Sequence, residues 1–556
     1  MKKFSKLITV LMAILFCFSL VACGRKGHSG DWDVEIDEHK RQLYVSNFNG
    51  GYGDGWLRAA ATRFEEQNKN RTFSDGKVGV QIIAENAKIT GPNLMGTVLS
   101  SRNHVFLTEG VVYKDYVSQG IMLDISDIVT APLTAYGETK SISDKMTQEQ
   151  RDSLVIGGKY YAIPHYAGYN GITVNVDLMD EQDLFMSSTG QFNKKSTSTG
   201  LSNGPDGVSG TYDDGLPSTY DEFYALCTNM KKRGITPMSW SGQYQWYVTH
   251  TLAAMCVDDM GLEASKLQFT FNDGSCSVIN TISDNGSYTT ENKNITLANG
   301  YEVFKQPGFY NSLAFIKKIV GEKWYTDESF ASSQSHTQAQ DSFLASGKVN
   351  RATQIGMLVE GCWWESEATG TFNSMEKKYK EAGKKDRKFR FIPFPKSSSA
   401  KVGEGATLVE ANQAYGFIRS NIETTDGAEM KNLAKDFLQF INTDVSLVEF
   451  SVNTDTVKAL DYTVADADLA KMSYFGRSLL QLKNDPKTKI LYPPLTNIYS
   501  NNYIDLQFMN RLKYNNYSDP TDAFVNNPTL TAKAYFNGMA SKWEEKWETV
   551  LAKANS

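Results

Sequence analysis

The residues best suited to chemistry in this sequence are aromatic rings that stand next to carboxylates. The segment EGCWWE, residues 360–365, follows an apolar run that we predict to be a buried strand. An indole ring can stack on the C–H face of a sugar, and a carboxylate can accept hydrogen bonds from the hydroxyls at its edge. Trp363 and Glu360 are therefore candidates for binding a sugar. Because neighbouring residues of an extended chain point to opposite sides, we expect Trp364 in the core, although both tryptophans could serve the core alone.

A second aromatic group lies in a segment that contains glycine, and we expect this segment to be a loop rather than a helix interior. Rings in a loop are candidates to contact a ligand, although the same rings could pack in a core. The candidates are Trp240, Tyr244 and Trp246.

The first predicted strand, residues 42–46, runs into a turn that is rich in glycine. Gly50, Gly51 and Gly53 lack a Cβ, so the backbone amides of this turn can approach a ligand closely. Glu109 follows another predicted strand, where its carboxylate could accept hydrogen bonds from hydroxyls or cap a helix. The polar candidates within the turn are Asn47, Asn49 and Tyr52.

An acidic segment, residues 204–215, places carboxylates among glycines. Calcium prefers roughly six to eight oxygen ligands from carboxylates and carbonyls on a tight turn. Asp206, Asp213 and Asp214 are therefore candidate ligands of a structural calcium ion, although the spacing of an EF-hand is missing. The alternative is an acidic turn that is solvated. We expect no cofactor for catalysis.

The sequence holds none of the common catalytic motifs. Its six histidines are scattered, and there is no H-E-x-x-H, G-x-S-x-G or phosphate-binding loop. We therefore predict that the protein is not an enzyme. A secreted enzyme that acts on glycosides stays an alternative, because the two carboxylates of a glycosidase leave no sequence motif. The net charge of -6 argues against a nucleic-acid partner, which requires a basic surface.

The N-terminus carries the signals of a secreted lipoprotein. Residues 1–6 include three lysines and no acidic residue, and an apolar run follows over 7–22. The end of this run and the next residue form the sequence Leu-Val-Ala-Cys, with the cysteine at Cys23. This ending resembles the lipobox of bacterial lipoproteins, which implies cleavage before Cys23 and a lipid anchor on it; an ordinary signal peptide is the alternative. The run is shorter than the ~20 residues of a spanning helix. We expect a signal peptide over 1–22, a linker over 23–39, and anchoring at the extracellular face of the bacterial cytoplasmic membrane.

Short apolar strands alternate with amphipathic helices along the chain, which is the pattern of an α/β fold. An irregular insertion over 186–215 and a polar, turn-rich insertion over 272–299 interrupt this pattern. Outside the cytosol, the remaining cysteines could form disulfides in any of three pairings. These cysteines are Cys227, Cys256, Cys276 and Cys362. We predict strands over 42–46, 78–84, 104–107, 171–175, 355–359 and 415–418, and helices over 56–68, 92–101, 113–119, 220–232, 312–319, 428–441 and 532–552.

The order and spacing of several segments resemble the extracellular solute-binding lipoproteins of ABC importers, and within them the carbohydrate-binding, maltose-binding-protein-like branch (family 1). The similar segments are 43–66, 105–125, 158–178, 217–234, 355–365 and 414–441, about a third of the chain. The resemblance implies the α/β fold of periplasmic binding proteins, with two lobes, hinge crossovers and a central ligand cleft. It implies a first lobe over 40–166, a second over 167–397, a return to the first over 398–470, and a C-terminal helical segment, 471–556, mostly in the second.

The resemblance also implies a function and further site residues. The family's loop at this place supplies a stacking tryptophan, which corresponds to Trp363. Tyr166, Tyr169 and Asn170 lie at the expected first crossover, where they could touch a ligand or pack the hinge. The protein would be a monomeric receptor that captures a carbohydrate, an oligosaccharide given its aromatic groups, and delivers it to an ABC transporter permease. A peptide or another polar solute is the alternative ligand.

Overall fold

The computed structural model describes residues 32–86, 94–410, 412–422, 427–517 and 519–554. The predicted signal peptide and Cys23 lie outside the described residues, so the lipid anchor stays a prediction. Within the described residues, no helix combines the length and the apolar character that crossing a membrane requires.

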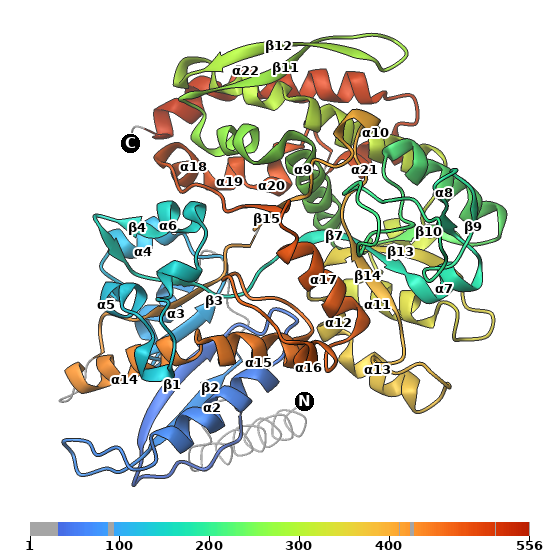
Figure 1. The fold of residues 1–556 in the computed structure, drawn as a ribbon. Coiled ribbons are helices and arrows are strands. Elements are labelled where there is room, and N and C mark those ends of the chain that lie inside the picture. Colours follow the sequence, from blue (N-terminus) through green and yellow to red (C-terminus); the bar gives the residue numbers. More distant parts are fainter. Residues whose placement is uncertain (1–31, 87–93, 411, 423–426, 518, 555–556) are drawn as a thin grey trace, which may run out of the picture.

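The first of two main sheets has five strands in the order β2-β1-β3-β16-β6. β1 pairs in parallel with β2 and β3, whereas β16 runs antiparallel to β3 and β6. The strands are β1 Arg41–Asn47, β2 Val80–Glu85, β3 Val105–Thr108, β6 Ile163–Pro164 and β16 Tyr415–Ile418. Around them lie α2 Gly55–Gln67, α3 Leu94–Ser100, α4 Tyr113–Ser118, α5 Ser126–Thr130, α6 Gln148–Leu154, α14 Gly427–Phe440 and α15 Asp444–Thr454 (Figure 1).

The unit formed by β1 and α2 follows from its residue pattern. Leu43 and Val45 are buried in β1 and are separated by a half-exposed residue. In α2, the buried residues Leu57, Ala61 and Phe64 recur at the spacing of one helix face. The helix therefore packs back onto the sheet, and the glycine-rich turn between the two elements is held at the sheet edge.

The second sheet has four strands in the order β10-β13-β7-β14. Every residue of β7 and β13 is buried, as expected for strands that are covered by helices on both faces. The strands are β7 Asn170–Asn175, β10 Thr236–Ser239, β13 Ile355–Gly361 and β14 Phe389–Ile392. The helices of this lobe include α7 Val176–Glu181, α8 Tyr220–Lys232, α9 Trp246–Thr270, α10 Pro307–Gly321, α11 His336–Ala345, α12 Trp364–Glu367, α13 Thr369–Glu376, α17 Tyr474–Asn484, α20 Phe508–Arg511, α21 Pro520–Asn526 and α22 Ala532–Ala554.

The chain passes between the two sheets three times. The first crossing joins β6 to β7, the second joins β14 to β16 through β15 (Thr407–Val409), and the third follows α15, because α15 packs on α2 whereas α17 packs on β14. The crossings are bonded to one another. The N–H of Ala167 donates to the carbonyl of Val457 at 3.0 Å, and the N–H of Gly168 donates to Glu410 Oε2 at 3.0 Å. This is the arrangement of a hinge between two lobes.

Residues 272–299 are more regular than the turn-rich insertion expected from the sequence. They form an antiparallel hairpin of β11 (Gly274–Ile282) and β12 (Tyr288–Ile295), which lies beside α22 at the outer edge of the second lobe (Figure 1). Cys276 and Val278 are buried on one face of β11, so the hairpin covers the lobe with a one-sided apolar pattern. The largely exposed polar residues of β12 obscured that pattern.

Helix α9 corrects the prediction of a loop around Trp246. The helix begins at this residue and runs to Thr270, interrupted at Gly261, which has a φ of 73°. Its residues are buried on several sides, including the polar Thr249 and Thr251. A helix that is enclosed in this way lacks the amphipathic periodicity by which helices are recognised in a sequence.

The four cysteines of the described chain are free, buried thiols, so none of the three possible disulfide pairings forms in the structure. Burial raises the pKa of each thiol, to about 12 for Cys362. The thiols are therefore protonated at neutral pH and act as small apolar groups in the core.

Candidate functional site

A cavity of about 820 Å³ lies between the two lobes. The strands β1, β3 and β13 all end at it, so it occupies the carboxyl edge of the sheets, where α/β proteins bind ligands. The lining residues are Phe48, Asn49, Gly50, Gly51, Tyr52, Gly53, Glu109, Tyr166, Trp246, Tyr247, His250, His336, Trp363, Ser366, Glu367, Asn412, Gln507 and Met509. Both lobes and a crossover thus contribute to one site.

Aromatic rings of the second lobe form one wall of the cavity. Trp246 and Tyr247 are stacked, with ring centroids 3.9 Å apart and planes inclined by 20°, and Tyr247 lies 6.3 Å from Trp363. Trp363 is only 6% exposed, because the glycine-rich turn of the first lobe covers it. A Cβ at Gly51 would lie 3.0 Å from Trp363 Cδ1, and the φ of 86° at Gly51 is one that glycine adopts without strain. The lobes therefore meet at this tryptophan.

The two adjacent tryptophans point to different places. Trp363 lines the cavity, whereas Trp364 is fully buried and its ring packs edge-on against Phe343, Phe389 and Phe475. Helix α12 begins at Trp364. The divergence of the two rings therefore comes from the turn of about 100° between successive helical residues, not from an extended strand.

On the first-lobe side, a buried chain of tyrosines holds a carboxylate at the cavity wall. The rings of Tyr52 and Tyr166 lie 4.3 Å apart, and the Tyr52 hydroxyl donates to the carbonyl of Ala167 at 3.1 Å. The Tyr166 hydroxyl donates to Glu109 Oε2 at 2.7 Å. Burial raises the pKa of Glu109 to about 7, against the opposing effect of the hydrogen bonds from Tyr166 and Asn412. Glu109 can accept further hydrogen bonds from a ligand.

On the second-lobe side, an amide links two carboxylates. Gln340 Nε2 donates to Glu367 Oε2 at 2.7 Å and to Glu360 Oε1 at 3.2 Å. Glu367 Oε1 lies 3.2 Å from His336 Nε2. Glu360 is buried behind the lining, and its pKa is raised by burial and by the neighbouring Glu367. Glu367 and His336 are the members of this network that line the cavity.

Six of the residues predicted for the site line the cavity and six do not. Trp240 is fully buried and packs on Tyr325 and Phe330, so it belongs to the core of the second lobe. The Tyr244 ring stands behind the lining, 5.5 Å from His336. Those in the lining are Asn49, Tyr52, Glu109, Tyr166, Trp246 and Trp363, and those outside it are Asn47, Tyr169, Asn170, Trp240, Tyr244 and Glu360.

The remaining residues outside the lining lie at the end of β1 or at the hinge. The amide of Asn47 donates to Asn86 Oδ1 at 3.0 Å. Tyr169 is buried at the hinge, where burial and the carboxylate of Glu410 raise its pKa. Asn170 is buried at the start of β7, and its side-chain amide has no hydrogen-bond partner among the described residues. Their position at the hinge was anticipated, but their side chains pack within it.

Several lining residues were not candidates in the sequence. On α9, His250 lies three residues after Tyr247 and four residues after Trp246. Recognising this segment as a helix would therefore have indicated that His250 lies near both rings. His336 begins α11, Gln507 is the N-cap residue of α20, and Met509 lies within α20. For these three the sequence carries no local signal, because only the packing of distant segments brings them to the cavity.

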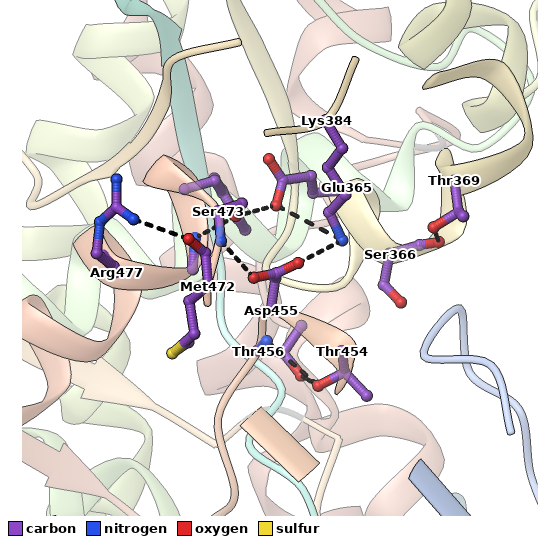
Figure 2. Close-up of polar contacts among 12 residues, drawn as sticks. Glu365, Ser366, Thr369, Lys384, Thr454, Asp455, Thr456, Met472, Ser473 and Arg477 are labelled. Atoms are coloured by element: carbon purple, nitrogen blue, oxygen red, sulfur yellow. Dashed lines mark hydrogen bonds and ion pairs between the residues drawn. The ribbon is translucent and has the colours of Figure 1, made fainter. Parts of the chain in front are cut away.

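A polar network lies behind the tryptophan loop and joins it to the third crossover (Figure 2). Lys384 Nζ lies 2.7 Å from Asp455 Oδ2 and 3.9 Å from Glu365 Oε2. Ser473 donates its hydroxyl to Glu365, and its N–H donates to Asp455 Oδ1 at 2.6 Å. The loop that carries Trp363 is thereby fixed to the segment that passes between the lobes.

The acidic segment forms a closed loop after the short hairpin of β8 (Phe185–Met186) and β9 (Phe192–Lys194). Asp213 is buried and accepts hydrogen bonds from the N–H of Asp206 at 3.0 Å and from the hydroxyl of Thr211 at 2.7 Å. Asp214 accepts one from the N–H of Gly210 at 2.7 Å. Within the described residues, no group of three or more His, Cys, Asp or Glu side chains is arranged to hold a metal ion. Calcium binding here stays a prediction.

The two lobes, the hinge crossovers and the cavity between them define a two-lobed solute-binding protein. The chain belongs to the family described as bacterial extracellular solute-binding protein, whose sequence model matches residues 53–445. No curated protein matches the chain significantly.

Solved structures share this fold at low sequence identity. A chitin oligosaccharide binding protein has a TM-score of 0.54 and 14% identity, over 92% of this chain and 99% of its own. The apo form of RafE from Streptococcus pneumoniae has a TM-score of 0.54 and 13% identity, over 91% and 98%. A probable secreted solute-binding lipoprotein from Streptomyces coelicolor has a TM-score of 0.54 and 12% identity, over 92% and 100%. At such identities the likeness concerns the fold.

Proposed function

We propose that the protein captures an oligosaccharide between its lobes and delivers it to the permease of an ABC importer. The observation that carries the proposal is the aromatic wall of Trp363, Tyr247 and Trp246, which faces hydrogen-bond acceptors on both lobes. Flat rings suit the C–H faces of sugar rings, and the carboxylates of Glu109 and Glu367 suit their hydroxyls.

The size of the cavity and the relatives of the chain support the same proposal. A volume of about 820 Å³ falls in the upper part of the range of ligand pockets, roughly 300–1,000 Å³. Structures of the same fold include proteins described with raffinose and with chitin oligosaccharides. The lipid anchor on Cys23 belongs to the proposal, because an importer receptor must stay close to its permease.

Calorimetry with a panel of mono- and oligosaccharides tests the proposal. Binding heat with an unchanged saccharide, checked by chromatography after incubation, is the expected result. Cleaved products would instead favour the glycoside-active enzyme, for which Glu109 and Glu367 would be the first carboxylates to replace. Titrations without heat for every saccharide, followed by binding of a peptide, would contradict the carbohydrate assignment.

The membrane anchor is tested separately. Expression of the full chain in a bacterium that processes lipoproteins should place it in the membrane fraction, and Cys23→Ala should release it. A chain that is equally soluble with and without Cys23 would contradict the anchor without affecting the proposed ligand.

A further inference from the structure

The cavity is lined by acidic side chains but by no lysine or arginine of the described chain. The two acidic side chains in the lining are those of Glu109 and Glu367. Two histidines also line the cavity. His336 Nε2 already contacts Glu367 Oε1 at 3.2 Å, and burial lowers the pKa of His250 to about 4, which leaves the His250 ring neutral.

The acidic side chains lie near Tyr247, which is part of the aromatic wall of the cavity. Burial raises the pKa of the Tyr247 hydroxyl, and the carboxylates of Glu360, Glu367 and Glu109 raise it further. Tyr247 belongs to the aromatic wall, so acidic groups of both lobes lie close to the place where a sugar ring would stack. No lysine or arginine of the described chain lines the cavity there, and His336, which lies near Tyr247, is already engaged with Glu367.

We propose that the cavity selects saccharides without acidic groups, and that Glu109 and Glu367 set this selectivity. The inference rests on the proposed function and names the class of its ligand: neutral or amine-bearing oligosaccharides, as opposed to uronates and sulfated sugars. Hydroxyl and ammonium groups donate hydrogen bonds to carboxylates.

An acidic ligand would meet two penalties in the cavity. Its carboxylate or sulfate would lose hydration without gaining a cationic partner, which is costly in a partly buried site. It would also be repelled by like charges, whose effect strengthens as water is excluded by lobe closure. Such built-in repulsion is a usual source of specificity between ligands of similar shape.

The first experiment compares matched ligands on the wild-type protein. Neutral oligosaccharides of several sugars are titrated by calorimetry at pH 8, where Glu109, with a pKa of about 7, is ionised, each beside its amino-sugar and its uronate counterpart of the same length. We expect a neutral or amine-bearing member to bind, and its uronate to bind at least about ten-fold more weakly. A uronate that binds as tightly as its neutral counterpart overturns the inference and leaves the proposed function standing. Failure of every saccharide to bind overturns the proposed function, and the inference with it.

The second experiment assigns the selectivity to its residues. Glu109→Gln and Glu367→Gln each remove one carboxyl group while keeping an acceptor oxygen. At pH 8, above the pKa of about 7 that burial gives Glu109, each should reduce the ratio between neutral and uronate affinity several-fold. Glu66→Gln is the matched control, because Glu66 is 71% exposed on α2 and does not line the cavity. Thermal melts establish that each variant is folded. An unchanged ratio in either folded cavity variant contradicts the role of that carboxylate, and an unchanged ratio in both overturns the inference.

Discussion

Trp363 holds a special position among the residues of the site. It lies beside Tyr247 of its own lobe and beneath Gly51 of the other, so its ring takes part in the wall of the cavity and in the contact between lobes. Under the proposed function, a ligand in the cavity would share this ring with the turn that covers it. We therefore expect binding and closure to be coupled at this side chain.

Replacing this ring should weaken ligand binding. We expect Trp363→Ala to reduce saccharide affinity by about 1–3 kcal/mol, the range of aromatic contacts at binding sites, as measured by calorimetry. Trp364→Phe is the control: it should lower the melting temperature, because Trp364 is fully buried, and keep the affinity within about two-fold. Wild-type affinity in Trp363→Ala would show that the ring does not stack on the ligand.

Glu410 should make the stability depend on pH. Burial raises its pKa to about 7, above its ordinary value of 4.5, so the folded protein holds a proton that the unfolded chain has lost. The free energy of unfolding should therefore fall as pH rises from about 4.5 to 7, by up to about 3 kcal/mol for this group. Glu410→Gln still offers an oxygen to the N–H of Gly168 and should show a smaller fall, measured by urea unfolding at pH 5 and 7.5. Equal falls in both proteins would contradict this role.

Among the elements, the turn between β1 and α2 decides how closely the lobes approach. Gly51 and Gly53 both have positive φ, of 86° and 74°, but only at Gly51 would a Cβ meet the other lobe. The second lobe therefore restricts one glycine of this turn and leaves the other free.

The two glycines form a matched pair of substitutions. Alanine at either position strains the backbone by about 1 kcal/mol, whereas Gly51→Ala also presses on Trp363 Cδ1 at 3.0 Å. Saccharide affinity, measured by calorimetry, should fall further in Gly51→Ala than in Gly53→Ala, by several-fold. Equal losses in both variants would show that the contact between the lobes contributes nothing to binding.

The network behind the tryptophan loop joins elements from different parts of the chain. Ser473 caps α17, where its hydroxyl oxygen accepts from the N–H of Gly476 at 2.9 Å, and it also donates to the buried Glu365. Ser473→Ala should lower the free energy of unfolding by about 1–3 kcal/mol, because a helix cap is lost and a buried carboxyl loses a donor. Thr369→Ala, at an exposed hydroxyl nearby (Figure 2), should change it by less than about 0.5 kcal/mol in the same urea titration. If both variants changed the free energy of unfolding by similar amounts, the network would not contribute to stability.

The elements were predictable where their residue pattern is local. Half-buried elements such as β1, α2 and α8 show their period in the sequence, and the fully buried strands β7 and β13 show as short apolar runs. Helix α9, enclosed on several sides, shows no such period and was missed. The hairpin of β11 and β12 was obscured by the polar strand that faces outward.

At the scale of the whole molecule, three bonded crossovers allow the lobes to move as two bodies about one hinge. We expect a saturating saccharide to decrease the radius of gyration measured by solution X-ray scattering, because ligands that bridge two lobes favour the closed form. A saccharide that binds in calorimetry without changing the scattering would indicate lobes that are already closed in the free protein.

By itself, the sequence determined the α/β class, the positions of the main strands and of the amphipathic helices, the glycine-rich turn and the loops that carry Trp363 and Glu109. These features follow from local periodicity and residue type, which neighbours along the chain can express. Only the tertiary structure decided that Trp240 belongs to the core and Trp363 to the cavity lining. It also brought His336 and Gln507 into that lining. Such choices depend on which distant segments pack together, and that information is not contained in any single stretch of sequence.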